Sequence, residues 1–226
     1  MTPAVPALRI AFAPGVTVSK WTKRWQDRHP ELPLEVFPAA ENDGVAVLHD
    51  GRATLSFVRL PIERDGLSVI RLYGEVPVLV VPRESELAEF ESITEPQVAD
   101  LAQVEVYSPA RPLKDAVALV AAGVGFLRLP HSLARLHARK DVVAIPIEGA
   151  AETEIAITWL RDETTELVEE FVGIVRGRTE ASSRANPTPP TPKVRAAKVA
   201  KPRSPKSPSR PAPKRSGGKT RKRGSR

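Results

Sequence analysis

The chain has 226 residues, and its 34 Lys/Arg and 27 Asp/Glu residues give a formal net charge of +7 at pH 7. Because it has no cysteine, a disulfide framework, a thiolate metal site and a thiol nucleophile are excluded. No segment approaches the roughly 18 consecutive apolar residues of a membrane-spanning helix, and residues 1–8 lack the pattern of a secretory signal. We therefore expect a cytoplasmic protein without a membrane partner.

The net charge conceals two parts of opposite sign. Residues 181–226 contain 15 Lys/Arg and no Asp/Glu, which leaves 19 basic and 27 acidic residues in 1–180. An acidic body of about 180 residues can bury one good core or two small lobes, while a segment of charge +15 is a plausible contact for a polyanion. We expect a folded domain at 1–180 and a tail at 181–226.

The body alternates strand-like and helix-like patterns, which is typical of an α/β domain with a largely parallel sheet. Short apolar or alternating segments predict strands, at 8–12, 34–37, 53–58, 69–72, 76–81, 104–107, 126–130, 142–147 and 155–160. Helical periodicity and end signals predict helices, at 17–28, 44–51, 94–101, 112–122, 132–139 and 165–176. Thr17 or Ser19 is expected to cap the first helix, where Trp21 and Trp25 share one face. The run 76–81 is apolar enough to be buried on both faces.

Several sequence blocks occur in the order that is typical of one known family. The longest runs from Val117 to Pro130 and has that family's helix, glycine turn and strand ending in proline. Shorter blocks that match are Leu8–Phe12, Arg28–Pro30, Leu48–Ala53 followed by Ser56–Val58, Val80–Pro82, and Ile157–Trp159 with the helix after it. Together these blocks resemble the effector-binding domain of LysR-type transcriptional regulators, and the resemblance covers about 8–178.

This resemblance implies a type 2 periplasmic-binding-protein-like fold with two α/β lobes and a small-molecule cleft between them. Lobe I would comprise about 8–78 and 155–178, and lobe II about 80–150. Lobe II is expected to be shortened, because only four residues separate Ser108 from Leu113 where the family has a further helix and strand. The matching region starts at residue 8, so we expect the family's N-terminal helix-turn-helix to be lacking. A homodimer is also implied by the resemblance.

A ligand in such a cleft would meet helix N-termini, whose free N–H groups and positive dipole end suit a carboxylate. The resemblance therefore implies a small organic anion as effector. Candidate contacts are the turn before the first helix and the residues just past two strands. These effector-binding candidates are Pro14, Gly15, Val16, Thr17, Arg59 and Ser108.

The tail carries nine prolines between Pro187 and Pro213 and no aromatic residue, so we expect it to be disordered. Its Lys/Ala/Pro and Ser/Pro steps resemble the basic tails of histone H1 and of bacterial nucleoid proteins. Such a tail would neutralise phosphates without reading sequence. The nucleic-acid-binding candidates are Lys193, Arg195, Lys198, Lys201, Arg203, Lys206, Arg210, Lys214, Arg215, Lys219, Arg221, Lys222 and Arg223. Ribosomal RNA, anionic lipid, or a charged tail without a dedicated partner are the alternatives.

Enzymatic function is not expected. The four histidines form no metal-ligand or catalytic spacing, and Gly123-Val124-Gly125 lacks the third glycine of a dinucleotide fingerprint, so no metal or cofactor is predicted. Four glutamates, Glu163, Glu166, Glu169 and Glu170, are expected on the solvated face of the last helix. We expect an effector sensor related to transcription regulators whose tail binds nucleic acid, in the cytoplasm or on the nucleoid. The alternatives are a nucleoid-associated or interaction protein whose degenerate lobe binds no small ligand, and a solute-binding module with an incidental tail.

Overall fold

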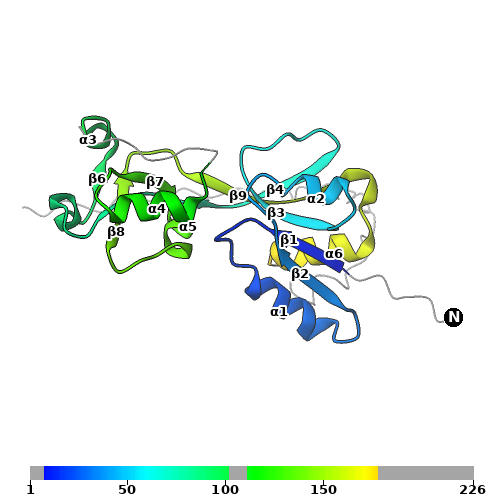
Figure 1. Ribbon diagram of the computed structural model, residues 1–226. Helices are drawn as coiled ribbons and strands as arrows, with labels where there is room; N and C mark the ends of the chain where they lie inside the picture. Colours follow the sequence, from blue (N-terminus) through cyan, green and yellow to red (C-terminus); the bar gives the residue numbers. More distant parts are fainter. Residues whose placement is uncertain (1–7, 102–110, 178–226) are drawn as a thin grey trace, which may run out of the picture. The chain divides into compact units, whose positions relative to one another are not determined.

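The structure is a computed structural model that describes residues 8–101 and 111–177, and it contains two β-sheets with flanking helices (Figure 1). The first sheet has five strands in the order β2-β1-β3-β9-β4, and the second has four in the order β6-β8-β5-β7. Helices alternate with strands along most of the chain, which confirms the predicted α/β class. The prediction of a largely parallel sheet is wrong, because four of the seven strand pairs in the described residues are antiparallel. Among the described residues, no helix combines the length and the apolar character that crossing a membrane requires.

The first sheet is mixed. Its strands are β1 (Leu8–Phe12), β2 (Leu34–Pro38), β3 (Leu55–Arg59), β4 (Leu67–Glu75) and β9 (Thr153–Leu160). β1 lies parallel between β2 and β3, whereas β9 runs antiparallel between β3 and β4. Its helices are α1 (Ser19–Arg28), α2 (Ala46–His49) and α6 (Glu166–Val175), with a 3-10 turn at Arg161–Glu163.

Aromatic packing fixes α1 and α6 on one face of this sheet (Figure 1). The rings of Trp25 and Phe171 lie 5.8 Å apart, and Phe171 meets Phe57 of β3 edge-on at 6.4 Å. Trp21 stacks on Phe57 at 5.1 Å. The predicted shared face of the two tryptophans is therefore part of the core. α2 covers the opposite face with Val47 and other apolar residues.

Two details of these helices differ from the predictions. The N-cap position of α1 is Val18, and no side chain caps the helix. Val18 has no hydroxyl, and its φ of −103° and ψ of −8° are helical instead of the extended values of a capping residue, so the predicted cap by Thr17 or Ser19 is wrong. The Glu170 side chain is only 36% exposed, and its carboxylate lies 2.9 Å from Nε2 of His29, the residue that follows α1.

The second sheet is built around β5 (Pro77–Pro82), which pairs antiparallel with β7 (Leu127–Pro130) and β8 (Val142–Glu148). β6 (Ile93–Thr94) joins the other edge of β8. The remaining helices are the 3-10 helix η1 (Glu86–Glu89), α3 (Glu95–Ala99), α4 (Leu113–Ala121) and α5 (His131–Leu136). The predicted strand at 104–107 and the tail at 181–226 lie outside the described residues.

β5 is buried on both faces, as its continuous apolar sequence predicts. Val78 and Val80 pack against α4 and α5, whereas Leu79 and Val81 pack against the η1 and α3 side. The chain passes between the two sheets twice, from β4 into β5 and from β8 into β9. Residues of both sheets meet near Arg59 at the end of β3, where Glu75 and Ser132 contact its guanidinium.

Candidate effector site

The candidate site is organised by Arg59, whose side chain is only 7% exposed although it carries a full charge. Its Nε donates to Glu75 Oε2 at 2.8 Å, and its Nη1 donates to the Glu41 carboxylate. Its Nη2 donates to the Pro14 carbonyl at 3.1 Å and to Ser132 Oγ at 3.2 Å. One guanidinium thus connects the β1–α1 and β2–α2 loops with the end of β4 and the start of α5.

The turn before α1 packs directly on α5. Gly15 has φ +81°, and a Cβ at this position would lie 2.9 Å from the backbone carbonyl carbon and from Oγ of Ser132. Only glycine fits both the left-handed backbone and this close approach. Val16 next to it is buried, while Thr17 is exposed. The turn 14–17 is therefore held between β1 and α5 by contacts on both sides.

The electrostatics of the site are set by two carboxylates around one cation. Burial acts to lower the pKa of Arg59, but the hydrogen bonds and charges of Glu75 and Glu41 outweigh this effect, so the pKa is raised. Burial also raises the pKa of Tyr73, with a further contribution from the charge of Glu75. Since the Glu75 side chain is only 5% exposed, the Arg59–Glu75 pair is buried and charged.

Beside this pair lies a depression of about 480 Å³. It is lined by the β2–α2 loop and by the end of β3 with the loop after it: Glu41, Asn42, Gly44, Val45, Val58, Arg59, Leu60, Pro61, Ile62 and Glu63. This volume lies within the range of small-molecule sites, about 300 to 1,000 Å³. Its lining combines apolar side chains with the polar or charged side chains of Glu41, Asn42, Arg59 and Glu63.

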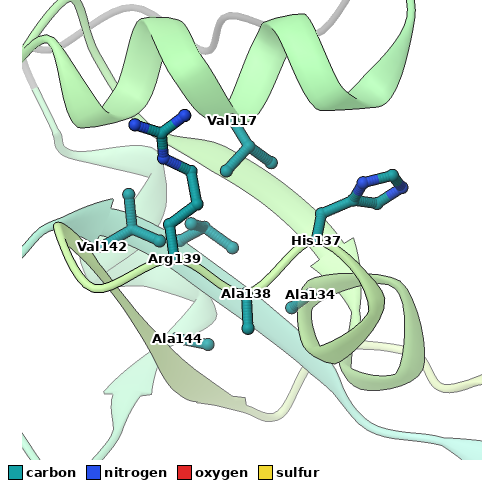
Figure 2. A pocket seen from close by; sticks show the side chains of 8 residues that line it. Val117, Ala134, His137, Ala138, Arg139, Val142 and Ala144 are labelled. Carbon is teal, nitrogen blue, oxygen red and sulfur yellow. The ribbon is translucent and has the colours of Figure 1, made fainter.

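A second cavity, of about 60 Å³, lies under α4 and α5 (Figure 2). Valine and alanine side chains converge on it, and His137 and Arg139 stand at its margin (Figure 2). The Arg139 guanidinium is paired with Asp141 at 2.7 Å. Since a water molecule takes up about 30 Å³, this cavity has room for about two waters and not for an organic effector.

The structure brings together three of the predicted effector-binding residues. Pro14 and Arg59 are joined by a hydrogen bond, and Gly15 packs on Ser132, the residue that also accepts from Arg59. Ser108 lies outside the described residues. In the described part of the chain, no group of three or more His, Cys, Asp or Glu residues could hold a metal ion.

The sequence reasoning missed Glu41, Glu75 and Ser132. A signal existed for Glu75, because an acidic residue directly before a buried apolar strand calls for a partner. Ser132 follows a strand that ends in proline, where a chain that turns into a helix exposes its first side chains. For Glu41, an exposed residue in a loop, no local signal distinguishes it from its neighbours.

This architecture of two sheets with flanking helices is also found in solved protein structures. It is shared by the BenM effector binding domain solved with its effector benzoate, at a TM-score of 0.62 and 17% identity over 80% of this chain and 96% of that one. The reduced OxyR regulatory domain from Pseudomonas aeruginosa matches at a TM-score of 0.59 and 16% identity, over 81% of this chain and 98% of that one. These likenesses confirm the predicted periplasmic-binding-protein-like fold.

The family follows from the sequence match. Residues 4–117 match the LysR substrate binding domain, and the chain belongs to this family. Along 197 residues it is 25% identical to the HTH-type transcriptional regulator BudR of Raoultella terrigena, a match that covers 72% of this chain and 68% of that regulator. The predicted resemblance to LysR-type effector-binding domains is thereby confirmed.

Proposed function

We propose that this protein senses a small-molecule effector in the manner of LysR-type regulators, in the cytoplasm and without enzymatic activity. The observation that carries the proposal is the position of Arg59, which touches the turn before α1 and the start of α5 at the same time. A ligand bound beside Arg59 would change contacts in both sheets' loops, and such a differential contact is what converts binding into a conformational response.

The effector is proposed to present a carboxylate to the turn at Pro14–Thr17. Two features of α1 support this. Its first turn contains no acidic residue, and no side chain caps it. The positive end of a ten-residue helix is therefore not neutralised by the chain itself. The proposed domain limits are 1–180 for the sensor, with lobes at 8–78 plus 155–178 and at 80–150.

A thermal-shift screen of the full chain with small carboxylates tests this function. A ligand that binds only the folded state stabilises it by about 2.7 kcal/mol at 100 times its Kd, so a true effector must raise the melting temperature in a saturable way. A variant with Gly15→Ala serves as a matched control, because its added methyl group would collide with Ser132 at the proposed contact. Unchanged melting temperatures across chemically diverse carboxylates would contradict effector sensing.

The tail at 181–226 is proposed to bind nucleic acid without sequence preference. Its 15 basic and no acidic residues support the proposal, since each phosphate neutralised adds affinity that falls with salt, at a log–log slope of about −0.9 on duplex DNA. The test is DNA affinity across a salt series for the full chain, for a chain ending at Glu180, and for a full-length variant with the 219–223 basic cluster changed to serine. We expect binding by the full chain, a shallower salt slope for the cluster variant and no binding without the tail. Equal binding by all three would refute the proposal.

A second function is favoured by one specific observation. The Arg59 guanidinium already has two carboxylate partners, so the site is partly occupied by the protein's own groups. This favours a nucleoid-associated or interaction protein whose effector lobe binds no small ligand. The two proposals differ in the thermal-shift screen: tail-dependent DNA binding together with a flat screen would support the second and refute the first. Light scattering of the full chain tests the homodimer that family membership implies.

A further inference from the structure

The charge around Arg59 is unbalanced toward the negative. Glu75 and Glu41 both contact its guanidinium, and Glu63 lines the same depression without an ion pair in the described part of the chain. Two carboxylates therefore contact the one guanidinium, and a third, Glu63, lines the depression beside it. Since Arg59 and Glu75 are both more than nine-tenths buried, neither can turn to water without leaving its partner as an uncompensated buried charge.

Arg59 is also nearly saturated as a hydrogen-bond donor. A guanidinium has five N–H groups, and four of those of Arg59 are used, by Glu75, Glu41, the Pro14 carbonyl and Ser132. One N–H remains, on Nη1. A carboxylate ligand needs two parallel N–H groups for bidentate binding, so Arg59 cannot clamp one in this arrangement.

The polar groups of the depression are mostly hydrogen-bond acceptors. Glu41 uses Oε1 for Arg59, which leaves its other oxygen, the Asn42 amide oxygen and the Glu63 carboxylate as acceptors among the lining residues. Ser56 Oγ is fully buried and has no hydrogen-bond partner in the described residues, and it lies 3.6 Å from the place of a Cβ on Gly44, one of the lining residues. Ser56 lies two residues before Val58 on β3, so its side chain points to the face that Val58 contributes to the depression. An ammonium group, with three donors and no acceptor, complements such a lining.

From this we infer that the effector is a zwitterion of amino-acid type, whose ammonium group binds at Glu41 and Glu63 while its carboxylate binds at the turn Pro14–Thr17. The inference rests on the proposed effector-sensing function and names its ligand class. The two ends are close enough for one small molecule, because the Pro14 carbonyl and the Glu41 carboxylate are bonded to Nη2 and Nη1 of the same guanidinium. The apolar wall of Val45, Val58 and Ile62 would receive the side chain.

The test is a thermal-shift titration of the full chain with the standard amino acids. For each amino acid that binds, the acid without the amine and the amine without the carboxylate are compared; for leucine these are 4-methylpentanoate and 3-methylbutylamine. We expect at least one amino acid to bind, and each truncated analogue to bind about tenfold or more weakly, as for the loss of a charge-assisted hydrogen bond. Carboxylic acids that bind as well as their amino acids would overturn the inference while leaving the proposed function intact. If neither acids nor amino acids bind, both are overturned.

Variants locate the ammonium contact. Glu63→Gln and Glu41→Gln preserve size and remove one negative charge each, and both side chains are exposed enough to be changed without loss of the fold. We expect each to weaken amino-acid binding about tenfold and to leave binding of the desamino acid unchanged. Glu169→Gln, on the exposed face of α6, is the matched control and should bind like the parent chain. Parent-like amino-acid affinity in both site variants would refute the assignment.

Discussion

Replacing Arg59 by methionine should destabilise the first sheet strongly, because it leaves Glu75 buried without its cation. The Glu75 side chain is 5% exposed, and its carboxylate receives the Nε–H of Arg59 at 2.8 Å. Removing one member of a buried ion pair costs about 3 to 5 kcal/mol, most of it the penalty of the remaining charge. The hydrogen bonds that the charged guanidinium donates to the Pro14 carbonyl and Ser132 are lost as well, and methionine packing offsets part of that loss. We therefore expect a loss of about 3 to 5 kcal/mol in the free energy of unfolding.

Urea denaturation followed by tryptophan fluorescence measures this loss of stability in the first sheet. The chain has three tryptophans, Trp21, Trp25 and Trp159, and all three belong to the core of the first sheet. The double variant Arg59→Met with Glu75→Met removes both charges and should recover most of the stability, since an apolar pair can replace a buried ion pair at little cost. The recovered energy measures the coupling between the two residues.

Arg71→Met is the control for the loss of an arginine as such. Arg71 pairs with Glu154 at 3.3 Å on the exposed side of β4, where an ion pair contributes about 0 to 1 kcal/mol. If Arg59→Met costs no more than Arg71→Met, or if adding Glu75→Met recovers nothing, the assignment of Arg59 as the partner of a buried carboxylate is wrong.

Three further predictions concern a close contact, a helix cap and a surface charge. Gly15→Ala should lower the free energy of unfolding by about 2 kcal/mol or more, because φ is +81° and the new Cβ would lie 2.9 Å from the backbone of α5. The control Gly51→Ala, with φ +66° and no atom within 4 Å, should cost only the backbone strain of about 1 kcal/mol. Equal costs for the two variants in urea denaturation would contradict the close contact. Thr165→Ala removes the oxygen that accepts the amide three residues on in α6 and should lower the free energy of unfolding by about 1 kcal/mol, and Thr165→Ser should restore most of it. The hydrogen bond from Arg139 lowers the pKa of Asp141 from 3.8 to about 2, so its stabilising contribution is present above pH ~4 and is lost as the pH falls toward 2. An NMR titration should show this midpoint, and Arg139→Gln should return it toward 3.8; an unchanged midpoint would refute the pairing.

Local patterns in the sequence predict most elements of the fold. β1 at Leu8–Phe12, α4 at Leu113–Ala121 and α6 after its Thr165 cap were all expected from apolar periodicity and end signals, which act over a few residues. β4 is longer than predicted, Leu67–Glu75 instead of 69–72. Its extra residues are held by the ladder with β9, which starts at residue 153, and no alternation within β4 reports that pairing.

The candidate site is likewise predicted only in part by the sequence. The glycine turn before α1 and the cation at the end of β3 can be recognised from the sequence, because glycine conformation, strand ends and residue charge are local properties. That the cation is neutralised cannot be recognised, since Glu75, Glu41 and Ser132 lie 16, 18 and 73 residues away from Arg59. Whether a charged side chain is a free ligand or half of a buried pair depends on which loops the two sheets bring to it. That choice belongs to the tertiary structure, because electrostatic energy is determined by distance in space and by burial, and neither follows from separation along the chain.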